Sequence, residues 1–130
     1  MEPDGLPEDV LQFLLDHIES VPHLEALLLL WRDPQASWTP GEMANRLYVA
    51  PDAAAKLLED LARHGLVTVG AESPRVYRYC TDWDAGNLLM PKISATYSRQ
   101  LVRVAQLLHS KASPGVREFA RAFRIKKEPN

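Results

Sequence analysis

The stretch "TPGEMANRLYVAPDAAAKLLEDLARHGLV", residues 39–67, decides the fold of this chain. It opens with Thr39 as an N-cap, with Pro40 at the first helical position and Glu42 three residues after the cap. This pattern is a capping box followed by a favourable proline, and it marks the start of a helix. We expect a short helix that ends at about Leu47.

A second helix is predicted directly after the turn "YVAP". Pro51 is suited to its first position, and Gly65 is suited to a left-handed C-cap at its end. The core face of this helix has the spacing i, i+3, i+4, i+7. These residues are Ala54, Leu57, Leu58 and Leu61. The two helices and the tight turn between them predict a helix-turn-helix unit.

Two β-rich runs follow the second helix. They are "LVTV", Leu66 to Val69, and "VYRYC", Val76 to Cys80. The segment between them, "GAESPR", contains the Gly, Ser and Pro that favour turns. The sequence therefore predicts a β-hairpin.

Two helices are predicted before residue 39. Pro7 to about Ser20 has apolar residues at helical spacing and reads as an amphipathic helix. Pro22 to about Arg32, "PHLEALLLLWR", is apolar nearly all round, so we expect it at the centre of the domain.

The C-terminal part is predicted to be helical as well. The run "LLMPKISATYSRQLVRVAQLLHSK" predicts one long helix with a single apolar stripe. The stripe consists of Ile93, Tyr97, Leu101, Val104 and Leu108. After a break at "ASPG", the run "VREFARAFRIKK" is amphipathic and basic, with Phe119 and Phe123 on one side and Arg117, Arg121 and Arg124 on the other.

Charge is distributed unevenly along the 130 residues, although the net charge is only −2. Through Ser20 there are six acidic and no basic residues, whereas nine basic and two acidic residues follow from Lys92 onward. This asymmetry fits either an anionic partner for the C-terminal part or acidic and basic ends that neutralise each other in the fold.

Several functional classes are not expected. The single cysteine, Cys80, excludes an intrachain disulfide. The four histidines are scattered, so we expect surface or packing roles, no metal site and no cofactor. No nucleophile, base and phosphate-binding loop are grouped, which argues against an enzyme. The acidic start and the lack of a long apolar run predict a cytoplasmic protein without a membrane role.

The order helix, helix, capped short helix, turn, helix and hairpin is that of a winged helix-turn-helix domain. The stretch from residue 39 to 67 resembles the matching segment of bacterial MarR-like and ArsR-like regulators, and the similarity covers roughly Leu24 to Cys80. The resemblance implies a mainly α fold with a small β-hairpin wing. We expect a winged helix-turn-helix domain over residues 1–86, including the first helix, and a C-terminal helical extension over residues 87–130 that is not an independent domain.

The resemblance implies a transcriptional regulator that binds double-stranded DNA, with affinity dominated by phosphates and modest base readout. The residues expected to contact DNA are Thr39, Arg46, Lys56, Arg75 and Arg78. In such regulators the exposed positions of the second helix enter the major groove. Here those positions hold Asp52, Ala53, Lys56 and Asp60, of which only Lys56 can donate to a base or a phosphate.

Three questions remain open from the sequence. The acid- and alanine-bearing helix also fits a winged-helix module that binds a protein partner and no longer binds DNA. The stripe from Ile93 to Leu108 can pack on its own domain or, as MarR-like proteins imply, form a homodimer. The basic run after residue 115 can contact DNA, a membrane surface or a partner protein. We favour its docking on the domain.

Overall fold

A computed structural model describes residues 5–71, 73–83 and 89–111. The elements are α1 (Glu8–His17), α2 (Val21–Arg32), α3 (Pro40–Leu47), α4 (Pro51–Arg63), β1 (Val67–Val69), β2 (Tyr77–Tyr79), α5 (Leu89–Arg99) and α6 (Leu101–Lys111). The fold is mainly α with a β-hairpin wing, as the sequence predicts. The basic run at residues 116–127, with its expected docking through Phe119 and Phe123, lies outside the described residues.

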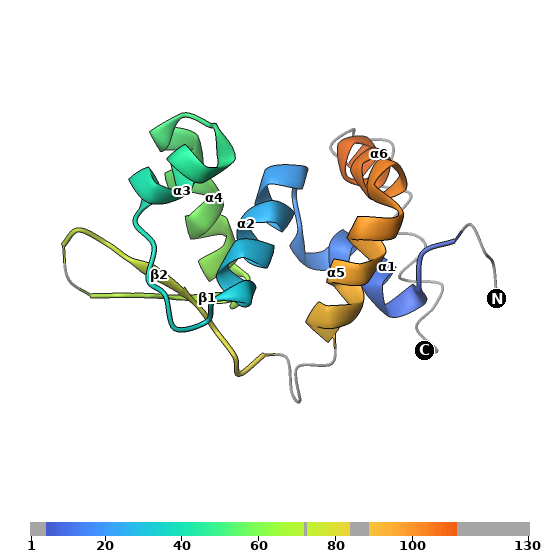
Figure 1. The fold of residues 1–130 in the computed structure, drawn as a ribbon, viewed down its shortest axis with the longest axis horizontal. Helices are drawn as coiled ribbons and strands as arrows, with labels where there is room; N and C mark the ends of the chain where they lie inside the picture. Colours follow the sequence, from blue (N-terminus) through green and yellow to red (C-terminus); the bar gives the residue numbers. More distant parts are fainter. Residues whose placement is uncertain (1–4, 72, 84–88, 112–130) are drawn as a thin grey trace.

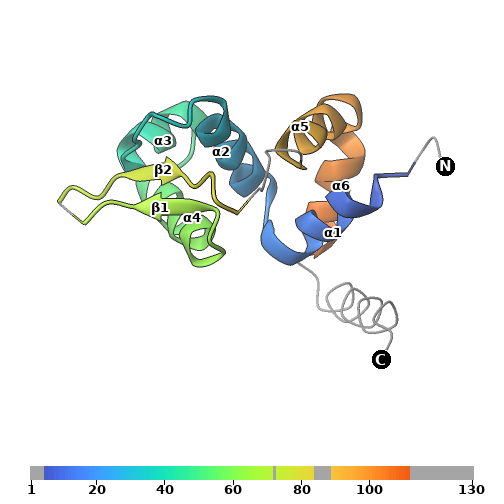
Figure 2. The same cartoon turned by 90° about the horizontal axis from the view of Figure 1, so that it is seen from below.

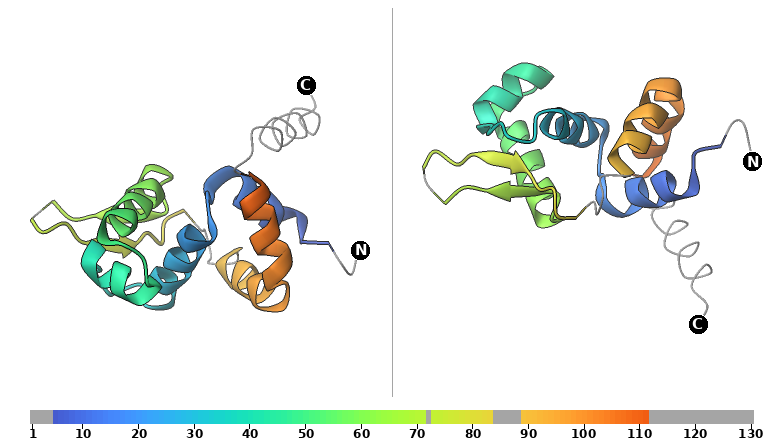
Figure 3. Two further views of the ribbon diagram at one scale, coloured as in Figure 1. Left: turned by 90° about the horizontal axis from the view of Figure 1, so that it is seen from above. Right: turned by 60° about the horizontal axis from the view of Figure 1, so that its bottom comes forward.

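The elements form two groups with α2 between them (Figure 1). Helices α3 and α4 and the hairpin lie at one end, and α1, α5 and α6 lie at the other (Figure 2). The further views in Figure 3 show the same arrangement. Because α2 is covered from both sides, most of its apolar residues are buried and Val21, Leu29 and Trp31 are partly buried, as expected for a central helix. The buried residues of α2 are Leu24, Ala26, Leu27, Leu28 and Leu30.

Local signals account for the helix-turn-helix unit. The hydroxyl of Thr39 accepts a hydrogen bond from the backbone N–H of Glu42 at 3.1 Å, and the Glu42 carboxylate accepts one from the Thr39 N–H at 2.9 Å. Tyr48 ends α3 in the left-handed conformation, with φ of 59°. Gly65 follows α4 with φ of 76°, a value that its lack of a Cβ permits.

The wing is a short antiparallel hairpin in which Val67 pairs with Tyr79 and Val69 with Tyr77. Trp38 adds a bridge on the other side of Tyr77, through two backbone hydrogen bonds of 2.9 and 2.8 Å. The loop between α2 and α3 is therefore fixed to the wing.

The prediction of a single long helix over residues 88–111 is wrong. The chain changes direction at Gln100 and forms two helices, α5 and α6 (Figure 1). The sequence has no Pro or Gly at this point, and its apolar residues keep helical spacing. The pattern therefore predicts an uninterrupted helix. The bend lets both helices pack against α1, which a straight helix of this length cannot do.

Side-chain contacts hold the C-terminal helices to the first two. Lys92 of α5 donates to Asp9 at 2.6 Å, and this bond lowers the pKa of Asp9. The Lys111 ammonium donates to the carbonyls of Leu14 and Ile18, near the end of α1. Acidic and basic ends thus neutralise each other in part, one of the two explanations of the charge asymmetry.

Tyr97 on α5 points toward α2. Its hydroxyl donates to the carboxylate of Glu25 at 2.8 Å. Burial and the neighbouring Glu25 raise the pKa of Tyr97 to about 12. None of the helices among the described residues combines the length and the apolarity that a membrane span needs.

Candidate nucleic-acid interface

Helix α4 occupies the position of the second helix of the helix-turn-helix unit, and its exposed residues have mixed charge. Its first turn exposes Asp52 and Ala53, and further along it exposes Lys56, Glu59 and Arg63. Two cations and two anions thus share this face. The buried face consists of Ala54, Leu57, Leu58 and Leu61, the residues that the sequence predicts.

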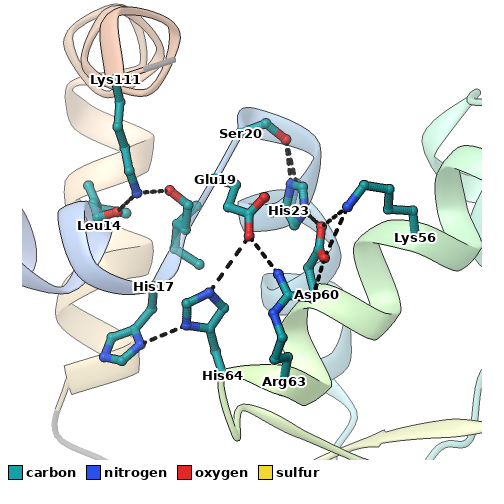
Figure 4. Close-up of polar contacts among 11 residues, drawn as sticks. Leu14, His17, Glu19, Ser20, His23, Lys56, Asp60, Arg63, His64 and Lys111 are labelled. Carbon is teal, nitrogen blue, oxygen red and sulfur yellow. Dashed lines mark hydrogen bonds and ion pairs between the residues drawn. The ribbon is translucent and has the colours of Figure 1, made fainter. Parts of the chain in front are cut away.

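Asp60 does not belong to the exposed face, contrary to the expectation from its position. It is 1% exposed and lies beside the apolar residues. Three side chains compensate its charge (Figure 4): Lys56 at 3.3 Å, Arg63 at 2.9 Å and His23 of α2 at 2.8 Å. Asp60 therefore does not repel the DNA backbone directly, but it holds the two cations of α4.

Burial tends to raise the pKa of Asp60, because a desolvated carboxylate favours the neutral form. The hydrogen bonds from His23, Arg63 and Lys56 overcome this effect and hold the pKa below its ordinary value. The carboxylate is accordingly ionised at neutral pH. A buried charge of this kind needs its partners, so removing one leaves an uncompensated group.

The polar network continues from Asp60 to the junction between α1 and α2 (Figure 4). Arg63 donates to Glu19 at 3.1 Å, and the same Glu19 oxygen lies 3.7 Å from Nε2 of His64. Nδ1 of His64 lies 3.3 Å from Nδ1 of His17 at the end of α1. The structure thus brings together three of the four scattered histidines within one network, which the sequence did not indicate.

The His17 imidazole is held toward its neutral form. Burial lowers its pKa, and the neighbouring His64 and Lys111 act in the same direction, while Asp16 opposes them. The contact between His17 and His64 joins the group formed by α1, α5 and α6 to the C-terminal end of α4. The helix-turn-helix unit is therefore joined to this group by a polar contact in addition to its apolar packing on α2.

Thr39 and Arg46 lie on α3, at its two ends. The oxygen of the Thr39 hydroxyl is occupied as the cap acceptor, which leaves its O–H proton to donate. Arg46 is exposed and borders an open hollow of about 440 Å³, together with Trp38 and Ser37 of the preceding loop. This hollow is shallow and faces solvent.

The wing contributes two arginines. Arg75 is exposed in the connection before β2. Arg78 points outward from β2, opposite Thr68, and donates to the hydroxyl of Ser37 at 2.9 Å. Since Ser37 also borders the hollow at Arg46, the structure places Arg78 and Arg46 at the same part of the domain.

These cations differ in what they already bind. Lys56 lies 3.3 Å from Asp60, and part of its charge is compensated there. Arg46 and Arg75 form no ion pair with any of the residues that the structure describes. Among the residues predicted to contact DNA, the cations without an ion pair are therefore on α3 and the wing, and α4 contributes less.

The predicted dimerisation residues do not form one exposed stripe. Ile93, Val104 and Leu108 are each 1% exposed and lie in the core of their own chain. Leu101 is 50% exposed and its neighbour Val102 is 65% exposed. Because α5 and α6 diverge at Gln100, the apolar surface that remains open lies at the beginning of α6.

Sequence reasoning missed Tyr48, which is 94% exposed in the turn between α3 and α4. A large aromatic side chain that is almost wholly exposed, on a residue with positive φ, is uncommon. The sequence predicts the turn "YVAP", but nothing in it shows which of these residues takes the left-handed conformation. The polar network has one local signal, the i,i+4 and i,i+3 spacing of Lys56, Asp60 and Arg63.

These features define a winged helix-turn-helix fold of the kind found in MarR-type regulators. A MarR family protein from Bacillus stearothermophilus has a similar structure, with 22% identity and a TM-score of 0.51 over 90% of this chain and 79% of the other. A possible transcriptional regulator from Methanosarcina mazei matches with 13% identity and a TM-score of 0.51, over 74% and 82%. Identities this low show the shared fold. No protein-family model and no curated protein matches the sequence.

Proposed function

We propose that this chain is a cytoplasmic transcriptional regulator of the winged-helix type that binds double-stranded DNA. The observation that carries the proposal is the presence of Arg46 and Arg75 on α3 and the wing, both exposed and both without an ion-pair partner among the described residues. Two cations beside a helix-turn-helix unit are suited to phosphate contact, which supplies most of the affinity for DNA.

Base readout is modest in this proposal. In the first turn of α4, the Asp52 carboxylate can accept a hydrogen bond from the amino group of cytosine, and Ala53 can touch a thymine methyl group. Arg78 supplies a further phosphate contact, and the O–H of Thr39 supplies another near the start of α3. Lys56 contributes when it is released from Asp60.

The regulator acts as a homodimer in this proposal. Leu101 and Val102 are the large apolar residues left open on the C-terminal helices in the described part of the chain. Contact between two copies at this surface covers it, and the same assembly presents two wings to two half-sites about one helical turn apart.

The test is fluorescence anisotropy of a labelled mixed-sequence duplex at low and moderate salt, with the oligomeric state measured on the same samples. We expect binding that weakens with salt, with a slope of log K against log salt of about −0.9 for each phosphate contact. The double variant Arg46→Gln, Arg75→Gln lowers both the affinity and the slope.

The double variant Arg99→Gln, Arg103→Gln is the matched control, because it removes the same charge from exposed arginines of α5 and α6 that have no ion pair with a described residue. It retains the affinity if the interface is placed correctly. Equal losses in the two double variants show that only the net charge matters, and this result overturns the proposed interface.

A protein-interaction module is the second candidate, and one observation favours it. Tyr48 and Ala53 expose uncharged surface at the turn and the first turn of α4, where a DNA reader usually presents polar or basic groups. An exposed tyrosine is common at protein interfaces. Failure to bind any duplex at low salt, with a folded dimeric sample, selects this function over the first.

A further inference from the structure

We propose that Glu19, His23 and Asp60 form a binding site for a divalent transition metal of the zinc class. Each residue offers one ligand atom, and the three atoms lie within 4.8 Å of one another. They come from the junction between α1 and α2, the first turn of α2 and the last turns of α4 (Figure 4). The site thus joins residues 19–23 to Asp60, which is 37 residues beyond His23 in the sequence.

The donor types and their separation suit such an ion. One imidazole nitrogen and two carboxylates are a usual zinc donor set, with metal–ligand distances of about 2.0–2.2 Å and a water in the fourth position. A tetrahedron of that size separates the ligand atoms by about 3.3–3.5 Å. Nε2 of His23 lies 2.8 Å from Oδ2 of Asp60, so a small rotation of the His23 ring makes room for the ion.

The second ring nitrogen of His23 already has the partner that a metal-bound histidine needs. Nδ1 lies 2.6 Å from the hydroxyl of Ser20. When the neutral ring carries its proton on Nδ1, it donates that proton to Ser20 and presents the lone pair of Nε2 to the ion. Such a bond fixes the tautomer and orientation of metal-binding histidines.

Asp60 is the fixed part of the site. It is buried, and its carboxylate oxygens already accept from His23, Arg63 and Lys56, so its position is set before an ion binds. Glu19 is exposed and closes the site from the solvent side.

Without an ion, Lys56 and Arg63 supply the positive charge that compensates the carboxylates of Asp60 and Glu19. Both have largely exposed side chains, 73% and 61%, that can turn into water without breaking the core. A divalent ion balances the two carboxylates of Glu19 and Asp60 in their place. Binding therefore releases two cations on the exposed face of α4.

This release links the metal to the proposed function and rests on it. With Lys56 and Arg63 free, α4 gains two groups that can contact phosphates, and the affinity for DNA increases. Each added phosphate contact also makes the salt dependence steeper, by about 0.9 in the slope of log K against log salt.

The site itself is tested without DNA, by titrating the tag-free full-length protein with Co²⁺ and recording its visible absorption, followed by displacement with Zn²⁺. We expect one Co²⁺ per chain with the absorption of a tetrahedral ion, and loss of that absorption on addition of Zn²⁺. His23→Gln and Glu19→Gln weaken Co²⁺ binding at least tenfold. His109→Gln, which changes an exposed histidine of α6, leaves it unchanged.

Asp60→Asn is unsuitable for the Co²⁺ titration, because loss of a buried charge can unfold the protein. Glu19→Gln is the suitable carboxylate variant, since Glu19 is exposed. Circular dichroism verifies that each variant is folded. Absence of a tetrahedral Co²⁺ spectrum overturns the site. A spectrum that survives in His23→Gln also overturns it.

A second measurement separates the site from its regulatory effect. Duplex anisotropy is recorded for the wild type and Glu19→Gln, with Zn²⁺ and with a chelator. Higher affinity with Zn²⁺ in the wild type alone supports the link to DNA. Co²⁺ binding by a protein whose duplex affinity is insensitive to Zn²⁺ overturns the link and leaves the site. A folded protein that binds Co²⁺ but no duplex overturns the proposed function instead.

Discussion

Nε2 of His23 lies 2.8 Å from Oδ2 of Asp60, and this contact connects the first turn of α2 with the last turns of α4 across 37 residues. Asp60 is the only acidic residue buried in the described part of the chain. Its carboxylate therefore fixes the second helix of the helix-turn-helix unit to the central helix by a polar contact, within an otherwise apolar interface.

Replacing Asp60 with Asn is expected to destabilise the fold by about 1–3 kcal/mol, because the bonds to charged partners are lost or weakened. Glu59→Gln is the matched control, since Glu59 is the exposed neighbour on the same helix. Its effect should stay within about 0.5 kcal/mol. Urea denaturation at neutral pH measures both. Equal stability of the two variants contradicts the role assigned to Asp60.

The contact between His17 and His64 predicts a pH dependence of stability. The folded pKa of His17 lies below the ordinary value of 6.5, because of burial and the neighbouring His64 and Lys111. Below pH 6.5 the unfolded chain therefore binds a proton at His17 that the folded chain does not. This contribution to stability is complete above that pH and decreases as the pH falls toward the folded pKa.

The measurement is the Tm of the wild type and two variants between about pH 7.5 and pH 5.5, the window of histidine titration. We expect the Tm of His17→Gln to fall less with decreasing pH than the Tm of the wild type. His109→Gln, exposed on α6, should keep the slope of the wild type. Parallel slopes for all three proteins exclude His17 as the titrating group.

The helix-turn-helix unit could be predicted from the sequence because its signals are local. The capping box of Thr39 and Glu42 is a contact between residues three apart, and the left-handed conformation at Gly65 is a property of that residue. Each can be recognised in a window of a few residues. The same holds for the apolar spacing of α4, which the packing then uses.

The polar network and the bend at Gln100 could not be predicted, because both depend on distant partners. Asp60 flanks the apolar face of α4, and its burial depends in part on His23, which lies 37 residues away in the sequence. The stripe from Ile93 to Leu108 continues helical spacing through Gln100. The packing of α5 and α6 on α1 determines the change of direction at Gln100, and the helix propensities of the residues do not indicate it.

The bend gives a prediction for two leucines of one helix. Leu108 is 1% exposed, whereas Leu101 is 50% exposed. Leu108→Ala should cost about 2–5 kcal/mol of stability, because it removes buried methyl groups and leaves a cavity. Leu101→Ala should cost about 0.5 kcal/mol or less.

Denaturation separates these two variants, and analytical ultracentrifugation measures their assembly. If Leu101 contacts a second copy, Leu101→Ala weakens the dimer while the monomer fold remains. A loss of stability in Leu101→Ala equal to that in Leu108→Ala is the result expected for one straight helix, and it contradicts the bend.

The left-handed conformation of Tyr48 predicts a difference between two small substitutions. With φ of 59°, a residue that carries a Cβ is strained by about 1–2 kcal/mol, and glycine is not. Since the side chain is 94% exposed, its removal costs little buried area. Tyr48→Gly should therefore be more stable than Tyr48→Ala by about 1 kcal/mol, because the greater freedom of unfolded glycine offsets part of the relief.

Urea denaturation of the two variants measures this difference, and duplex anisotropy shows whether the turn also contacts the ligand. If Tyr48 lies at the interface, both variants lose affinity to a similar extent although their stabilities differ, because both lack the aromatic ring. If affinity is kept in both, the ring is outside the DNA contact. Equal stability of the two variants means that residue 48 does not adopt the left-handed conformation in solution.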